Sequence, residues 1–228
     1  MDSVLFTTHI NVFLSRAILA VDSKSIMKLV PFIQAGFFPG QGEATNTDTG
    51  ERTKVIKVDK MAGELNLSVV FSPWAIHLVI ESQEVQSMDL LTQQVADIFK
   101  LLNETFDGNI PGIRLATVVT HVLKHDEKLE CKIYQATFKS EDVPSEWSFR
   151  HVRTSQVEQE KINNNLSVNK GNATAGIRGR IYTGDVIVVN VDNNTHLSNL
   201  SERFGVESPD FIDKLLSKTI SDVANLIG

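Results

Sequence analysis

The chain has 228 residues, of which 42% are hydrophobic and 22% are charged, and its formal net charge is −6. This length and composition are those of a globular protein with one large domain or two small ones, either of which can bury a core. The negative charge argues against a protein whose main task is non-specific nucleic-acid binding, because that task needs a basic surface to displace counterions.

The cysteine content and the N-terminal residues bear on the compartment. The one cysteine, Cys131, leaves no internal disulfide to form, which fits a reducing environment. Residues 1–14 have no basic residue before their apolar ones and include Thr7, His9 and Asn11, a poor pattern for a signal peptide or a membrane span. We therefore expect a cytoplasmic protein that does not contact membranes.

The N-terminal segments alternate between strand and turn patterns. Residues 4–14 alternate in polarity and predict a long first strand. Asp22 or Ser23 is expected to cap a short helix that Pro31 kinks or ends. Residues 40–53, GQGEATNTDTGERT, are polar and rich in turn-forming residues, and predict a mobile loop before a weaker strand at 54–59.

The stretch 64–82, ELNLSVVFSPWAIHLVIES, has the clearest pattern of the chain. Two alternating runs flank Ser72-Pro73 and predict a tight antiparallel hairpin. A helix over 87–106 follows, with Ser87 as N-cap and Gly108 as the left-handed residue past its end. Five hairpin side chains are expected to be nearly buried: Leu67, Phe71, Trp74, Ile76 and Leu78.

The second part of the chain also opens with a strand pattern and ends with a helix pattern. A long strand at 113–123 is followed by a charged turn at 124–128, and helix 208–227 has Ser208 as cap and Pro209 at its first position. Between them we predict three strands, at 129–138, 146–157 and 162–168, and then a loop at 171–176. A hairpin of 177–182 with 186–192 is expected to turn at Thr183-Gly184-Asp185, and a connection from 193 to 206 follows it.

These segments predict an α+β fold of antiparallel sheets, with one long helix closing each half of the chain. The halves are residues 1–109 and 110–228, as two units or one compact domain, and their similar order raises the hypothesis of a diverged internal duplication. Strands do not alternate regularly with long helices, which argues against a doubly wound parallel sheet.

Motifs for catalysis and cofactor binding are missing from the sequence. Gly36, Gly40 and Gly42 do not have the spacing of a phosphate-binding loop, and no Gly-x-Ser-x-Gly occurs. His121 and His125 would lie about 13 Å apart on one strand, too far to share an ion. Cys131 is expected mid-strand as a buried thiol rather than a nucleophile. We expect no cofactor, no metal and no catalytic set.

Two groups of arginines and aromatics are the candidate binding residues. Arg178, Arg180 and Tyr182 are expected on one strand face, and Trp147, Phe149, His151 and Arg153 on another. Such faces bind phosphates or bases, or form protein interfaces. In the remaining interpretation Trp147 and Phe149 are core and the arginines are solvated. The candidate set is Trp147, His151, Arg153, Arg178, Arg180 and Tyr182.

We therefore expect a non-catalytic protein that acts through protein–protein contacts, in a chaperone-like or accessory role. It would be an oligomer or a complex subunit, with sheet edges available for pairing. One alternative is an enzyme whose site is assembled from distant residues, such as His77, Glu81 and His151. The other is a nucleic-acid or nucleotide binder that uses Arg178 and Arg180.

Overall fold

The structure, a computed structural model, describes residues 2–45, 50, 52–140, 143–205 and 208–227. It is mixed helix and strand, 28% helical and 49% strand, with a large antiparallel sheet, which confirms the coarse fold class. The elements in chain order are β1 (Ser3–Leu14), α1 (Ser23–Lys28), α2 (Val30–Gln34), β2 (Phe38–Thr45), β3 (Arg52–Ala62), β4 (Leu65–Phe71), β5 (Ala75–Ser82), α3 (Met88–Phe106), β6 (Gly112–Lys124), α4 (Glu127–Phe138), β7 (Trp147–Val157), β8 (Glu160–Ile177), β9 (Arg180–Thr195) and α5 (Pro209–Ile227).

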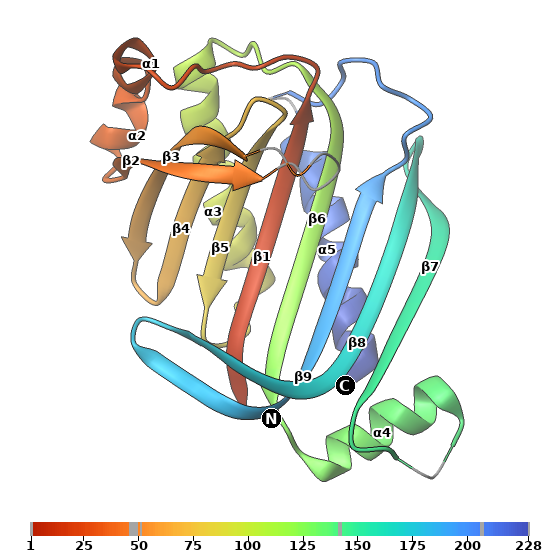
Figure 1. Cartoon of the computed structure of the whole chain (residues 1–228). Helices are drawn as coiled ribbons and strands as arrows, with labels where there is room; N and C mark the ends of the chain where they lie inside the picture. The colour runs from red at the N-terminus through yellow and green to blue at the C-terminus, as the bar shows by residue number, and fades with distance from the viewer. Residues whose placement is uncertain (1, 46–49, 51, 141–142, 206–207, 228) are drawn as a thin grey trace.

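All the named strands belong to one nine-stranded sheet in the order β2-β3-β4-β5-β1-β6-β9-β8-β7. The central pair, β1 and β6, joins the two parts of the chain in one sheet (Figure 1). Both β1 and β6 follow the alternation that the sequence predicts. Five helices accompany the sheet among the described residues, so one long helix closing each half is not confirmed as a description of the whole fold.

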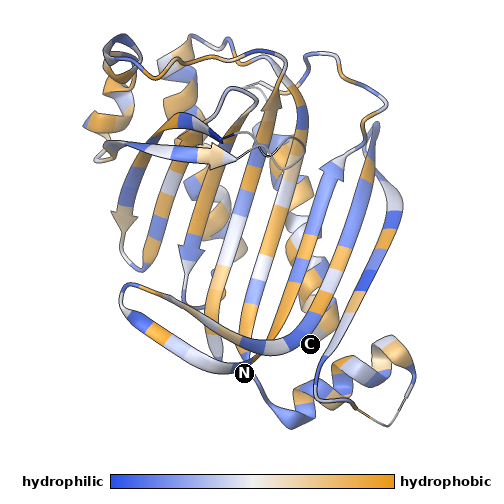
Figure 2. Cartoon of the chain, viewed as in Figure 1, coloured by the Kyte–Doolittle hydropathy of each residue, from blue (hydrophilic) through white to orange (hydrophobic). Residues whose placement is uncertain are grey.

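The sheet has two unlike faces, which we call closed and open. Both long helices, α3 and α5, lie behind the sheet in Figure 1, and the face they cover is the closed face. It is lined by fully buried side chains such as Ile10, Leu78 and Val119. Residues between these on the same strands point to the open face, and Figure 2 shows the resulting alternation of hydrophobic and hydrophilic bands.

The central hairpin and the helix after it form as predicted. Leu67, Phe71, Ile76 and Leu78 are at most 3% exposed, whereas Trp74, at the turn, is only partly buried. Helix α3 begins after Ser87, whose hydroxyl accepts from the backbone N–H of Leu90. Its left-handed C-cap is Asp107, with φ of 50°, one residue before the expected Gly108, which also has positive φ. The predicted short helix is interrupted, but at Leu29, which ends α1 and begins α2. Pro31 lies in the first turn of α2, so the break comes two residues before the proline.

Residues 38–45 form strand β2 and not the predicted loop. β2 pairs with β3 from Phe38↔Asp59 to Thr45↔Arg52, so its backbone groups that face β3 are paired despite a composition poor in strand formers. β3 itself extends beyond the predicted 54–59. Residues 46–49 and 51 of the predicted loop lie outside the described residues.

Residues 127–138 form helix α4, and the predicted strand at 129–138 is wrong. The Asp126 side chain accepts from the N–H of Leu129 at 2.9 Å and caps the helix, while Leu129 and Ile133, four residues apart, are buried on one side. Cys131 therefore lies on a helix and is exposed, contrary to the expectation of a buried thiol in a strand. The cap explains the error, because the charged run that we interpreted as a turn starts a helix.

The last hairpin is much longer than predicted and turns elsewhere. β8 and β9 pair continuously from Ile162↔Thr195 to Ile177↔Arg180, so 171–176 is strand and Thr183-Gly184-Asp185 is not the turn. The turn is Arg178-Gly179, with positive φ at both positions (54° and 76°), which suits the twist of a hairpin. β9 also continues to Thr195, into the connection predicted from 193.

The far end of the β8–β9 hairpin bends in front of the open face where β1 begins (Figure 1). A small apolar cluster holds it there, with Val4, Val122 and Val186 buried and Ala173, Ala175 and Tyr182 packed against them. The open face is thus partly enclosed at one end by a segment of its own chain. None of the described helices is both long enough and apolar enough to cross a membrane.

Candidate functional site

The six candidate binding residues lie in two separate parts of the sheet. Arg178, Arg180 and Tyr182 belong to the bent end of the β8–β9 hairpin, whereas Trp147, His151 and Arg153 belong to β7, the last strand of the sheet. Arg178 is a turn residue and Arg180 begins β9, so the expected common strand face of Arg178, Arg180 and Tyr182 is wrong.

Arg178 fastens the hairpin tip to the opposite half of the sheet. Its Nε donates to Asn66 Oδ1 at 3.0 Å and its Nη2 donates to the carbonyl of Leu65 at 2.8 Å. Arg180 makes one hydrogen bond to a described side chain, from Nη1 to Gln83 Oε1 at 2.8 Å. These guanidinium groups are engaged within the fold, and their contacts span from β9 past β6, β1 and β5 to the start of β4.

Trp147, the first residue of β7, takes part in a buried group of polar contacts centred on Glu130. Its Nε1 donates to Glu130 Oε1 at 2.9 Å, and Glu130 also accepts from Lys170 Nζ and contacts His125 Nε2 at 2.6 Å. Burial raises the pKa of Glu130, but the hydrogen bonds from Lys170, His125 and Trp147 outweigh it and hold the pKa below its ordinary value. This carboxylate joins α4 to β7 and β8.

The histidines do not assemble a metal site in the described part of the chain, where no cluster of three or more metal-ligating side chains occurs. His121 is 3% exposed on the closed face, with Nε2 3.0 Å from Ser3 Oγ and its ring edge-on to Phe6. Burial lowers the pKa of His121 to about 4. His125 instead faces Glu130, so the two histidines have separate partners.

The open face carries the polar groups considered for catalysis. Glu81 and His77 lie on β5 beside β1, which adds His9 to the same face. His77 Nδ1 is 2.9 Å from Asn11 Oδ1, and burial, with the charge of His9, lowers the pKa of His77 to about 4. Burial also lowers the pKa of His9, against the opposing effect of Glu81. His151 lies on β7 at the edge of the sheet, so the three residues named from sequence do not form one set.

Amide side chains extend the polar part of the open face onto the C-terminal strands. Asn194 Oδ1 accepts from Arg114 Nη2 at 3.3 Å and from Asn163 Nδ2 at 3.1 Å. Asp192, two residues before Asn194 on β9, accepts from Asn194 Nδ2 at 3.0 Å. It has no direct ion pair among the described residues, and burial raises its pKa. The asparagines are clustered on β8 and β9, at 163–165 on β8 and at 190, 193 and 194 on β9, and this enrichment is visible in the sequence although it was not among the predicted candidate residues.

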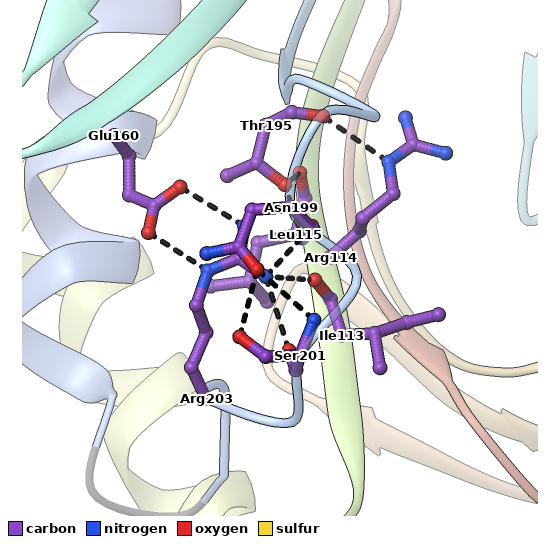
Figure 3. A network of polar contacts seen from close by, with 8 residues as sticks. All are labelled: Ile113, Arg114, Leu115, Glu160, Thr195, Asn199, Ser201 and Arg203. Atoms are coloured by element: carbon purple, nitrogen blue, oxygen red, sulfur yellow. Dashed lines mark hydrogen bonds and ion pairs between the residues drawn. The ribbon is translucent and has the colours of Figure 1, made fainter.

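A second arginine cluster serves the connection from β9 to α5 (Figure 3). Arg203 donates to both carboxylate oxygens of Glu160 and, through Nη1, to the carbonyls of Ile113, Asn199 and Ser201. Its side chain is 16% exposed and its guanidinium lies over the ring of Phe204, 4.4 Å from the centroid. The geometry is that of a structural clamp.

β7 is the longer of the two edge strands of the described sheet. β7 is the last strand of the sheet and pairs with β8 over eleven residues, without a bulge or a proline. Val152, at its middle, is 51% exposed. The other edge strand, β2, has eight residues and includes Pro39, which has no N–H to offer.

Comparison of the chain with protein-family models, with curated proteins and with solved structures gives no match.

Proposed function

We propose that this chain is a non-catalytic binding protein that acts through protein–protein contact, and that the partner adds a strand to the outer edge of β7. The observation that supports this most directly is the free, regular, eleven-residue edge. Such an edge offers a template of backbone donors and acceptors to an extended segment of another chain.

The register of the β7–β8 hairpin identifies the backbone groups that face outward. The turn has two residues, and the flanking pair Val157↔Glu160 closes the ladder. In such hairpins the flanking pair exchanges both hydrogen bonds, so every second residue of β7 turns its N–H and C=O toward β8. The alternate residues, whose backbone groups face outward, are Ser148, Arg150, Val152, Thr154 and Gln156.

The charge of β7 indicates the chemistry of the partner. Between Trp147 and Val157 the strand carries Arg150 and Arg153 and no carboxylate. These arginines would repel a second β7, since like charges disfavour pairing, and they would attract an acidic segment. The proposed partner is therefore an extended acidic segment of another protein, with an apolar residue opposite Val152. Self-association, the other arrangement expected from the sequence, is an outcome that the experiment detects.

The test is binding of a labelled decapeptide of alternating glutamate and valine, measured by fluorescence anisotropy at low salt. We expect binding that weakens as salt rises, since exposed charges are screened within about 10 Å at 0.1 M. Val152→Pro removes one outward N–H without removing a β7–β8 hydrogen bond and should abolish binding, whereas Val152→Thr keeps the N–H and should bind.

Hydrogen exchange followed by NMR locates the peptide. Added peptide should slow amide exchange at Arg150, Val152 and Thr154, while residues already bonded to β8 change little. Equal binding by Val152→Pro and by the wild type would contradict the proposal. Light scattering of the free protein separates a monomer from a self-associated form, and a dimer that Val152→Pro dissociates would identify a second copy as the partner instead.

We also propose that the halves 1–109 and 110–228 derive from a duplication, each closed by one long helix. The connectivity supports this: β1 pairs with β5 and β6 with β9, in each case the last strand before a 19-residue helix. Because β6 would lose its partner β1, residues 110–228 expressed alone should form a dimer through β6. An unfolded or strictly monomeric fragment would count against this origin.

A further inference from the structure

A cavity of about 320 Å³ lies on the closed side of β7 and β8, beside α5. Helix α5 packs against β6 and β9, so the closed face of the last two strands extends beyond the helix. The cavity has an apolar floor formed by Leu166 and Val191. Its volume is within the range of sites for small molecules, at the lower end.

The walls of this cavity carry a net positive charge. Arg153 lies on the β7 side, and Lys218 and Asp222 lie on the α5 side. Asp222 is already compensated, because its Oδ2 accepts from Lys218 Nζ at 3.0 Å and from Asn193 Nδ2 at 3.1 Å. Arg153 has no ion pair with a described residue. The two cations and the one carboxylate leave a charge of +1 among these three side chains, in a chain whose formal charge is −6.

Arg153 and Ser155, which line the cavity, have hydrogen-bond donors without an acceptor among the described residues. The one hydrogen bond from Arg153 to a described side chain runs from Nε to His151 Nε2 at 3.2 Å, which leaves both Nη groups for a ligand and requires His151 Nε2 to be unprotonated. The Ser155 hydroxyl, which also lines the cavity, is buried and has no hydrogen-bond partner among the described residues. Such an unpaired buried hydroxyl is uncommon, because it loses its hydration without replacement.

We infer that this cavity is a binding site for a small organic monocarboxylate. The carboxylate would accept from the Nη groups of Arg153 and from the Ser155 hydroxyl, since planar guanidinium groups suit carboxylates. The apolar body of the ligand would lie on Leu166 and Val191. The single surplus positive charge matches a monoanion better than a phosphate dianion. This inference is independent of strand addition at β7, because it concerns the closed side of the strand and not its outer backbone groups.

The probes are benzoate, the neutral benzamide and phenyl phosphate, titrated into the full-length protein and followed by NMR. We expect benzoate to shift the amide signals of Ser155, Leu166 and Asn225, and to bind about tenfold more tightly than the other two probes, as the loss of a charge-assisted hydrogen bond implies. Tighter binding of phenyl phosphate would overturn the match to a monoanion.

Matched variants separate the cavity from general surface charge. Arg153→Gln and Ser155→Ala should each weaken benzoate binding, and Arg153→Gln should remove the preference over benzamide. Arg150→Gln removes the same charge from the open side of β7, and Lys214→Gln removes a cation one turn away on α5 that pairs with Glu158. Both controls should bind benzoate as the wild type does.

Three results would overturn the inference: no benzoate binding at millimolar concentration, unchanged binding in Arg153→Gln, or signal shifts that fall outside the cavity. Dispersed NMR spectra of each variant confirm that it is folded. Because the decapeptide is tested with Val152→Pro, which leaves every cavity side chain in place, failure of the two proposals can be told apart.

Discussion

The closed and open faces of the sheet carry opposite chemistry on the same strands. On β5, Ile76, Leu78 and Ile80 are at most 2% exposed on the closed face, whereas His77 and Glu81 are half-buried on the open face. The closed face is covered by long helices and stabilises the fold through burial of apolar area. The open face is crossed at one end by the β8–β9 hairpin and at the other by β2, which runs in front of β4 and β5 (Figure 1), and it carries amides and titratable groups. The apolar burial that stabilises the fold is therefore concentrated on one face of the sheet.

The largest expected difference between the faces is in core packing. Leu78→Ala should lower the free energy of unfolding by about 2–5 kcal/mol, because it leaves a cavity among side chains that are fully buried. Val79→Ala, next to it on the open face, should cost less than about 1.5 kcal/mol, since solvent can reach the site. Urea denaturation of both variants measures this, and equal losses would contradict the assignment of the two faces.

The pH dependence of stability should also differ between the faces. The pKa of His121 is lowered from 6.5 to about 4 by burial. Above pH 6.5 neither state is protonated. Between pH 6.5 and 4 the unfolded chain binds a proton at His121 that the folded chain does not bind. The free energy of unfolding therefore falls by on the order of 3 kcal/mol.

Urea unfolding at pH 7 and pH 4 tests this. His121→Gln should remove much of the loss between the two pH values. The pKa of His77 is also lowered to about 4, but its half-buried ring is better screened by solvent, so His77→Gln should restore less. An unchanged pH profile for His121→Gln would show that other groups govern acid unfolding.

The smallest effect is expected at the hairpin that encloses the open face. Arg178→Ala removes hydrogen bonds to the Leu65 carbonyl and to Asn66, and should cost about 1 kcal/mol. Hydrogen exchange over 171–187 should become faster while the core strands are unaffected. Arg180→Ala loses only the bond to Gln83 and should change exchange less. Equal effects would show that the apolar cluster, not Arg178, holds the hairpin in place.

Local patterns predicted most of the elements and missed those that depend on a partner strand or a cap. The hairpin at 64–82, the helix at 87–106 and the first strand of each half follow from periodicity, because one face of each is buried. β2 was not predicted as a strand, because its strand conformation comes from pairing with β3. Helix α4 escaped because its apolar residues are few and the capping role of Asp126 was not recognised.

The candidate binding residues were also predicted one by one from the sequence, whereas their grouping into sites was not. Arg153 and His151 were identified as candidates from sequence, and Ser155 lies on the same strand, but Leu166 of β8 and Lys218 of α5 become their neighbours only through the tertiary fold. Arg178 and Arg180 were placed on one strand face, whereas the position of the turn makes Arg178 a clamp. Single residues with binding chemistry can be recognised locally, but their grouping depends on strand order.

The sequence by itself determined the α+β class, the alternation that separates two faces along the long strands, and helix starts at Ser87 and at Asp22 or Ser23, since these depend on contacts within a few residues. Only the tertiary structure decided that β1 and β6 meet at the centre of one sheet, that β7 is left as a free edge, and that the β8–β9 hairpin bends across the open face. The physical reason is that strand order and register depend on pairing between residues far apart in the chain, which short-range periodicity does not encode.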